Sequence, residues 1–305
     1  MLTGQDTRRA NLRAKRRRAA VPYLFIAPTF ILLAIFSYYA VISSVVYAFT
    51  DYRIGRAANF IGFANFTRMF RDPVFFTSMR NQIIITLVSV FNAIFWPLLA
   101  AELVFWIRHK RASGLVKTAF IIPMLVPGIV TAMMWKTLYN PFFGFNSILK
   151  AIGFEHLTTD WLNNRQTALG AILMIGFPFI SGLNFLIFHA ALNGIASDYQ
   201  ESASIDGASS MQIVRYMHLP NIRQYISVIS ILAIIGSLQN YGLVMATTGG
   251  GPGYETYILA LHMYRVAFGS FEMGYGSAMG VFICIVIILL TLIQQKFTGG
   301  TVAKD

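Results

Sequence analysis

The residue types that most often carry chemistry are scattered along this chain. Its five histidines form no H-x-x-x-H pair and predict no zinc site: His109, His156, His189, His218 and His262. We expect His189, which lies in an apolar segment, to hydrogen-bond a neighbouring helix. A single cysteine, Cys284, excludes an intrachain disulfide and a cysteine-cluster metal site. No G-x-S-x-G or G-x-x-x-x-G-K-S/T segment occurs, so the sequence predicts neither a serine-nucleophile enzyme nor a nucleotide site.

The segment from Asp198 to Pro220, DYQESASIDGASSMQIVRYMHLP, carries the most specific pattern. It predicts a short helix over Tyr199–Ile205 and a second helix over Ala208–His218. Gly207 lies between them, where a residue with positive φ reverses the chain. Pro220 is expected to start a further helix that enters the membrane.

Two interpretations are open for the surface of this segment. Met211, Val214 and Met217 have the spacing of an apolar stripe on one helix face. A helix lying on the bilayer prefers a basic polar face, whereas this segment sets Arg215 against three acidic residues: Asp198, Glu201 and Asp206. The composition therefore favours docking to a soluble partner, whose close approach is allowed by small residues: Ser202, Ala203, Ala208 and Ser209.

Polar side chains within apolar segments mark either helix–helix hydrogen bonds or a water-filled path, because unpaired polar groups are costly in lipid. Gln82 and Asn92 are two such residues. Four others combine amides, which suit hydroxyl groups, with an aromatic face for a sugar ring: Asn184, Gln239, Asn240 and Tyr241. Both interpretations stay open for each of them.

Glycine and proline mark several turns and close contacts. The run from Gly249 to Gly251 with Pro252 is followed by no helix start bearing lysine, so it is no phosphate loop. We interpret it as a flexible turn leading into a re-entrant stretch, Tyr254–Phe268. The small residues of Gly276–Gly280 predict close helix packing. Three prolines are expected to break helices inside apolar segments: Pro123, Pro127 and Pro178.

Composition places these segments in a membrane. Hydrophobic residues make up 56% of the 305 residues and charged residues only 12%, about half the share of roughly 25% in soluble domains. The same numbers exclude a disordered chain and a nucleic-acid-binding domain. A membrane-crossing helix needs about 20 mainly apolar residues, and six stretches qualify: Val21–Thr50, Gln82–Ile107, Thr118–Leu138, Thr167–Leu192, Tyr225–Thr248 and Met273–Gln295. The expected fold class is therefore an all-α membrane protein with six transmembrane helices.

The basic residues predict how these helices are oriented. The net charge is +12, and 7 of the 24 lysines and arginines lie in the first eighteen residues. With the N-terminus inside, 15 of the 24 lie on the cytoplasmic side, and basic loops stay cytoplasmic. We therefore expect both termini in the cytoplasm, with residues 1–20 as a basic tail, 21–297 as the membrane domain and 298–305 as a second tail.

The loop at 198–220 resembles the EAA motif of bacterial ABC importer permeases. That pattern runs E-A-A-x-x-x-G, nine residues, then I-x-L-P, and here it is Glu201-Ser202-Ala203, Gly207 and Met217-His218-Leu219-Pro220. Ser202 replaces an alanine and Met217 an isoleucine, without change of spacing. Further segments resemble the carbohydrate-uptake permeases of the maltose and glycerol-3-phosphate type: FTDY at 49–52, FIGFANF at 60–66, Asp72-Pro73, WKTLYNPFFGFN at 135–146 and TGGGP at 248–252.

This resemblance implies a type I ABC importer-like membrane domain in the bacterial inner membrane. Its coupling helix would dock into a cytoplasmic ATPase dimer through eight residues: Glu201, Ser202, Ala203, Asp206, Gly207, Met211, Leu219 and Pro220. A second, similar permease would complete the path for a sugar or oligosaccharide. An extracytoplasmic solute-binding protein would contact four residues: Gly249, Gly250, Gly251 and Pro252. The chain itself would hold no cofactor, since ATP and Mg would bind to the partner ATPase.

Two other functions remain open on the residues alone. An ion-coupled carrier working by itself usually has charged groups in its spans, and Glu102 is the one acidic residue within the six predicted stretches. Sodium coupling through carbonyl oxygens stays open. A membrane assembly factor without a solute path would have no use for the docking loop. We therefore expect a permease subunit that is not itself an enzyme.

Overall fold

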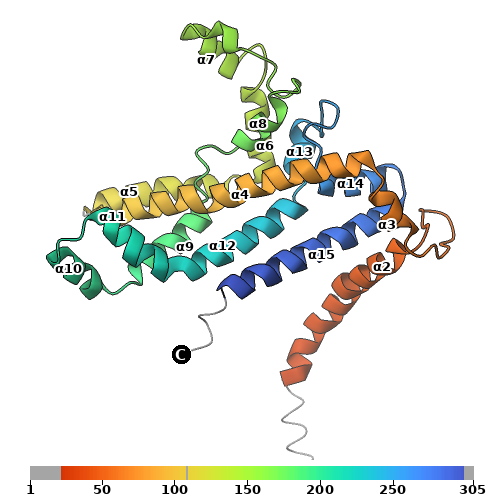
Figure 1. Ribbon diagram of the computed structural model, residues 1–305, viewed down its shortest axis with the longest axis horizontal. Helices are drawn as coiled ribbons and strands as arrows, with labels where there is room; N and C mark the ends of the chain where they lie inside the picture. The colour runs from red at the N-terminus through yellow and green to blue at the C-terminus, as the bar shows by residue number, and fades with distance from the viewer. Residues whose placement is uncertain (1–21, 108, 299–305) are drawn as a thin grey trace, which may run out of the picture.

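The computed structural model describes residues 22–107 and 109–298, and these residues are almost entirely helical (Figure 1). In this part of the chain the only β pairing is an isolated bridge between Thr50 and Phe60. The predicted tail at 1–20 and residues 299–305 of the second predicted tail lie outside the described residues.

Four helices are long and apolar enough to cross a membrane. The first is Pro22–Ala48, which contains a π-helical turn, η1 (Ala34–Tyr38), followed by α2 (Tyr39–Ala48). The others are α4 (Pro73–Phe105), the continuous helix Ser210–Gln239, and the span Met273–Lys296 within α15 (Met273–Thr298). The first, second and sixth predicted stretches thus appear as single helices, although α4 begins nine residues earlier than predicted.

The third and fourth predicted stretches are broken helices. In the third, α5 (Lys110–Ile121) and the 3₁₀ turn η2 (Ile122–Leu125) are bent by 93° from α6 (Gly128–Leu138). Pro123 lies in the 3₁₀ turn and Pro127 caps α6, which confirms the predicted breaks at both prolines. A proline has no backbone N–H and clashes with the preceding helical turn, so the α-helical ladder ends there.

The fourth stretch divides around Pro178. The helices are α8 (Ala168–Met174) and α9 (Gly182–Asn193), and the break between them includes Phe179 at a φ of 62°. Such backbone strain in a non-glycine residue is uncommon and concentrates at functional sites. The third predicted break is therefore also confirmed.

The fifth stretch differs from its prediction at both ends. Its helix begins at Ser210 as α11 (Ser210–Ile213), passes through the π-helical turn η4 (Val214–His218) and continues as α12 (Leu219–Gln239). Pro220 starts no new helix, so that prediction is wrong. In η4 the N–H of Leu219 donates to Val214 O, five residues back, and this wider turn accommodates the proline within a continuous helix. Beyond Gln239 the chain breaks at Asn240 and resumes as α13 (Gly242–Thr247).

The helix α4 is the centre of the packing. Its C-terminal half packs against α9 and α12 through a fully apolar cluster: Ala100, Ala101, Val104, Phe185, Phe188, Leu192, Ile222 and Ile229. The helix α15 packs beside α12 and α2, and near its C-terminal end Gln294 Nε2 donates to Ser227 O of α12 at 2.8 Å. The short helices α10 (Ser197–Ile205) and α11 lie at one end of the long axis, and α3 (Ala64–Met69) and α14 (Leu259–Tyr264) lie at the other (Figure 1).

Small residues allow the closest helix contacts at the α3 end. A Cβ on Gly276 would lie 2.7 Å from Ala267 Cβ, in the π-helical turn η5 (Arg265–Gly269). The small-residue pattern at 276–280 therefore packs closely, as predicted. On the far side of α6, the chain forms an outer lobe from α7 (Phe145–Ala151) and the 3₁₀ turn η3 (Glu155–Leu157), which lies away from the long axis (Figure 1).

Candidate coupling loop and solute path

The predicted coupling loop is an exposed helix–turn–helix at one end of the molecule. Its first helix, α10, ends at Ile205, and Gly207 follows with a φ of +80°, which confirms the predicted reversal. A capping box then starts α11: Ser209 Oγ accepts from Gln212 N, and the Gln212 side chain accepts from Ser209 N at 2.7 Å. The local sequence thus defines both ends of the turn.

Apolar side chains of this loop face outward. Ile205 is 85% exposed, Met211 73% and Tyr199 69%. Val214 and Met217 are half-buried, and the buried member of α11 is Ile213, so the predicted stripe covers only part of the outward surface. No side chain or backbone atom lies within 4 Å of the position that a Cβ on Gly207 would take. This loop therefore presents a small-residue turn between exposed apolar groups, as a docking surface requires.

A recess of about 840 Å³ lies behind the loop, between it and the ends of α9 and α12. Ser202, Ala203 and Asp206 line it from the loop, and Tyr216, Met217 and Tyr225 line it from the long helix. The loop therefore stands off from the helix bundle rather than packing flat against it.

The base of the loop is anchored in the bundle by a buried polar contact. His218 Nδ1 lies 3.0 Å from both carboxylate oxygens of Glu102. His218 is fully buried and Glu102 is 7% exposed. The histidine ring also packs edge-on against Phe105, with ring centroids 5.1 Å apart. Glu102 is the acid that the sequence singles out, but nothing in the sequence identifies His218 as its partner.

A cavity of about 470 Å³ lies where the broken helices meet α4. Among the predicted path residues, Asn184 lines it. Its Nδ2 also donates to Ala93 O of α4 at 2.9 Å, so Asn184 both bonds a helix and faces the cavity. Other polar groups share this lining: Ser89, Asn92 and Thr131. Sequence analysis names Asn92 as a polar span residue, but the helix breaks are needed to place Ser89 and Thr131 beside it.

The other three predicted path residues do not line this cavity. Asn240 Oδ1 accepts from Gly242 N, the first residue of α13, at 3.0 Å. Tyr241 stacks on Tyr264 with ring centroids 4.8 Å apart, and Gln239 is exposed at the end of α12. These residues form the break between α12 and α13, separate from the cavity that contains Asn184.

The glycine-rich segment is an ordered turn rather than the flexible one that we predicted. Gly249 and Gly250 have φ values of 62° and 94°, and a Cβ on Gly250 would lie 2.3 Å from Tyr257 Cδ2. Arg265 Nη2 donates to Gly249 O at 2.6 Å, and Thr256 Oγ1 donates to Gly251 O at 2.8 Å. Positive φ and close approach both require glycine here, so tertiary contacts determine the conformation of the turn. Gly251 and Pro252 remain partly exposed beside it.

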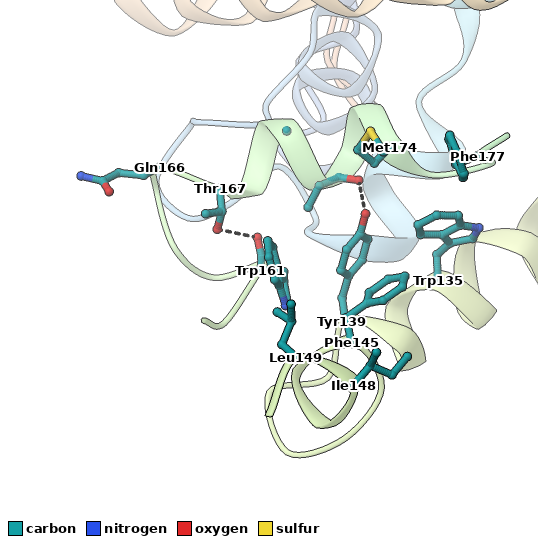
Figure 2. A pocket seen from close by; sticks show the side chains of 12 residues that line it. Trp135, Tyr139, Phe145, Ile148, Leu149, Trp161, Gln166, Thr167, Met174 and Phe177 are labelled. Atoms are coloured by element: carbon teal, nitrogen blue, oxygen red, sulfur yellow. Dashed lines mark hydrogen bonds between the residues drawn. The ribbon is translucent and has the colours of Figure 1, made fainter. Parts of the chain in front are cut away.

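The outer lobe contains an aromatic pocket of about 600 Å³ (Figure 2). Trp135, Tyr139, Phe145 and Trp161 line it together with the break residue Phe177. The polar ends of the aromatic rings are satisfied within the lobe: Tyr139 Oη donates to Ala171 O at 2.9 Å, and Trp161 Nε1 donates to Asn146 Oδ1 at 2.8 Å. Burial raises the pKa of Tyr139 to about 12, which keeps this hydroxyl a donor. The segment 135–146 therefore builds an apolar lobe.

Residues 83–299 match the family of the binding-protein-dependent transport system inner membrane component. The chain belongs to this family. It is 30% identical over 281 residues to a probable ABC transporter permease protein of Pyrococcus horikoshii, covering 91% of this chain and 96% of that protein. It is 28% identical to the diacetylchitobiose uptake system permease protein NgcF of Streptomyces coelicolor, covering 88% and 81%.

The fold of this permease is also found in a solved structure. A chain of the bacterial ABC transporter that imports the acidic polysaccharide alginate superposes with a TM-score of 0.83 and 21% identity, covering 96% of this permease and 100% of that chain. The permease is thus a multi-pass inner-membrane transport component and not an enzyme. In the described part of the chain no group of histidine, cysteine and acidic residues could hold a metal ion.

Proposed function

We propose that this permease forms half of the membrane path of an ATP-driven importer for a sugar or oligosaccharide. The observation that carries the proposal is the cavity at the helix breaks, where Asn92 and Asn184 present amides to one space and Phe179 presents an aromatic ring. Amides suit hydroxyl groups, and aromatic faces suit the apolar faces of sugar rings. Relatives named for uptake of diacetylchitobiose and of arabinooligosaccharides support the same solute class.

Six crossings and cytoplasmic termini are part of this proposal. Four single helices and one bent pair are apolar enough to cross, and α8 with α9 supplies the sixth crossing as a second broken helix. The inner ends of α4, α9 and α15 then lie on the side of the coupling loop (Figure 1). Among the described residues, that side carries five of the basic residues counted as cytoplasmic in the sequence: Lys110, Arg111, Arg215, Arg223 and Lys296.

A cytoplasmic ATPase dimer binds ATP and Mg and docks on the coupling loop. The residues proposed for this contact are exposed or half-buried: Glu201, Ser202, Ala203, Asp206, Gly207, Met211, Leu219 and Pro220. The turn at Gly207 leaves open space on its outer side, which suits insertion into a cleft of a partner.

Two further partners complete the importer. A second, similar permease supplies the other wall of the path, since α2, η2 and α6 leave many apolar side chains uncovered. An extracytoplasmic binding protein contacts the turn at Gly249, Gly250, Gly251 and Pro252, on the far side from the coupling loop. Solute moves from there past Gln239, Asn240 and Tyr241 to the cavity at Asn184.

The test is reconstitution in liposomes. The permease, its partner permease, the ATPase and the binding protein are expected to take up radiolabelled oligosaccharide only with ATP inside. Uptake that continues without ATP and stops when the ion gradient is collapsed would instead establish a carrier. A complex that binds no ATPase and moves no solute would establish an assembly factor, but family membership supports neither alternative.

A further inference from the structure

Two polar contacts join α4 to the continuous helix Ser210–Gln239, one near each end of their interface. At the outer end Gln82 Nε2 donates to Ser237 O at 2.9 Å, and the Thr86 and Ser237 hydroxyls lie 2.9 Å apart. At the inner end Glu102 meets His218. Between these contacts the two helices touch through apolar side chains, among them Ala101 and Ile229.

The apolar and the polar contacts differ in the movement that they allow between the two helices. Apolar contacts are non-directional and tolerate sliding of one helix along another. A buried hydrogen-bonded pair fixes one register, because any displacement leaves a desolvated polar group without its partner. The inner pair is the stronger constraint, since one ring nitrogen of the fully buried His218 meets both oxygens of Glu102.

The inner pair lies between the coupling loop and the cavity. His218 ends the π-helical turn that joins the loop to α12, and π-helical turns recur at functional sites. Glu102 lies ten residues along α4 from Asn92 of the cavity lining, a separation of about 15 Å at 1.5 Å per residue. None of the α12 residues lines the cavity, whereas α9, which leads into the loop, lines it through Gly182 and Asn184. A displacement of α12 therefore reaches the cavity through α4, which lines it through Ser89 and Asn92.

We propose that the Glu102–His218 pair is the positioning link that makes α4 follow the coupling loop. The inference rests on the proposed function, because it takes the loop to be moved by a docked ATPase. A movement of the loop is carried by His218 to Glu102 and then along α4, which continues through Pro97, to Ser89 and Asn92. The outer contact at Ser237 keeps the two helices parallel during this movement.

The decisive variants remove the polar bond between Glu102 and His218 but keep the packing of the two helices. Glu102→Leu with His218→Leu replaces the pair by apolar groups, a change that is often neutral or stabilising for a fold. In the complete importer in liposomes we expect normal assembly and continued ATP hydrolysis, while solute taken up per ATP falls by about tenfold, within the range typical of site–site coupling. Glu102→Gln retains an oxygen that accepts from Nδ1–H, so its uptake per ATP should stay close to the parental value.

Uptake per ATP at the parental value in the leucine pair would overturn the link. If the leucine pair fails to assemble, the exchange Glu102→His with His218→Glu restores the bond in reverse. A swapped complex with parental uptake per ATP supports the proposal, and an assembled swap with a tenfold loss overturns it. The variant Gly207→Val distinguishes failure of the link from failure of the proposed docking. If transport is lost in Gly207→Val but uptake per ATP is parental in the leucine pair, only the link is overturned. Parental transport in Gly207→Val overturns the docking role of the loop.

Discussion

Gly207 is the residue that tests the proposed docking of the coupling loop most directly. It has a φ of +80° with open space around it, so valine there introduces backbone strain of about 1–3 kcal/mol and a side chain at the proposed contact. We expect Gly207→Val to lose most ATPase co-purification and solute-stimulated hydrolysis, because a few anchor residues carry most of the energy of such contacts. The measurement is affinity co-purification from membranes, followed by hydrolysis assays in liposomes.

Gly55 offers a matched control for this variant. Its φ is +82°, and it too has open space around it, but it lies in the loop between α2 and α3 at the opposite end of the molecule. Gly55→Val therefore introduces the same strain away from the ATPase. If both valine variants lose the ATPase equally, the loss reflects general misfolding, and the docking role of Gly207 is rejected.

Of the four predicted path residues, Asn184 is the one that lines the cavity. Alanine at this position removes an amide from the cavity and the bond to Ala93 O. We expect Asn184→Ala to change solute selectivity or lower the uptake rate while the complex still assembles. Asn193→Ala, in the same helix but outside the cavity lining, should transport normally. Normal uptake of several oligosaccharides by Asn184→Ala would reduce this residue to a helix–helix contact.

At the scale of elements, a polar cluster joins the outer ends of α4, α14 and α15. Asp72 caps α4 and lies 3.2 Å from His262 Nε2 and 2.9 Å from Tyr275 Oη. Burial lowers the pKa of His262, and it outweighs the opposing effect of Asp72. Burial alone would raise the pKa of Asp72, but hydrogen bonds from Val74 N, Tyr275 and His262 lower it. The His262–Asp72 contact is therefore a hydrogen bond from a neutral imidazole at neutral pH.

This cluster predicts acid sensitivity of the outer end. Because the folded pKa of His262 lies below the unfolded value of 6.5, the unfolded chain binds more protons and stability falls as the pH drops below 6.5, levelling off below the folded pKa. We expect the midpoint of thermal unfolding in detergent to fall between pH 7 and pH 5. His262→Gln keeps an amide donor for Asp72 without titrating, so its midpoint should vary less over this range. An equal pH dependence in both proteins would contradict the assignment.

The helices also show which parts of the fold can be predicted from the sequence alone. Long apolar runs predict the first, second and sixth spans because length and composition are sufficient there. Pro123, Pro127 and Pro178 predict the breaks in the third and fourth, because each removes a donor from its helix. The helix continues through Pro220 because a π-helical turn precedes the proline. The turn at Gly250 is ordered because the Tyr257 ring packs against it. Contacts between residues distant in sequence, such as Glu102 with His218, have no local pattern that could reveal them.

At the scale of the whole molecule, the proposed function takes the energy for transport from a separate ATPase subunit. The purified permease contains no phosphate-binding G-x-x-x-x-G-K-S/T loop, so we expect no ATP hydrolysis by the permease in detergent. Addition of the ATPase, the second permease and the solute-loaded binding protein should restore hydrolysis. The assay is phosphate release, with a complex carrying Gly207→Val as control. Sustained ATP hydrolysis by the permease alone, with the same activity per amount of permease in every ion-exchange fraction, would contradict the proposal that a separate subunit hydrolyses ATP.

The pairing of the first and last helices also has a consequence for biosynthesis. The α2 segment packs against α15, and Gly274 N donates to Tyr52 O at 2.9 Å. A Cβ on Gly274 would clash with Thr50 O, so the start of α15 and the segment after α2 meet closely. Residue 273 is synthesised 225 residues after residue 48, which takes roughly 10 to 45 s at 5–20 residues per second. During that interval the first helix is in lipid without α15, its packing partner. Its most apolar stretch has no buried residue even in the folded chain, so lipid can surround it until α15 is synthesised.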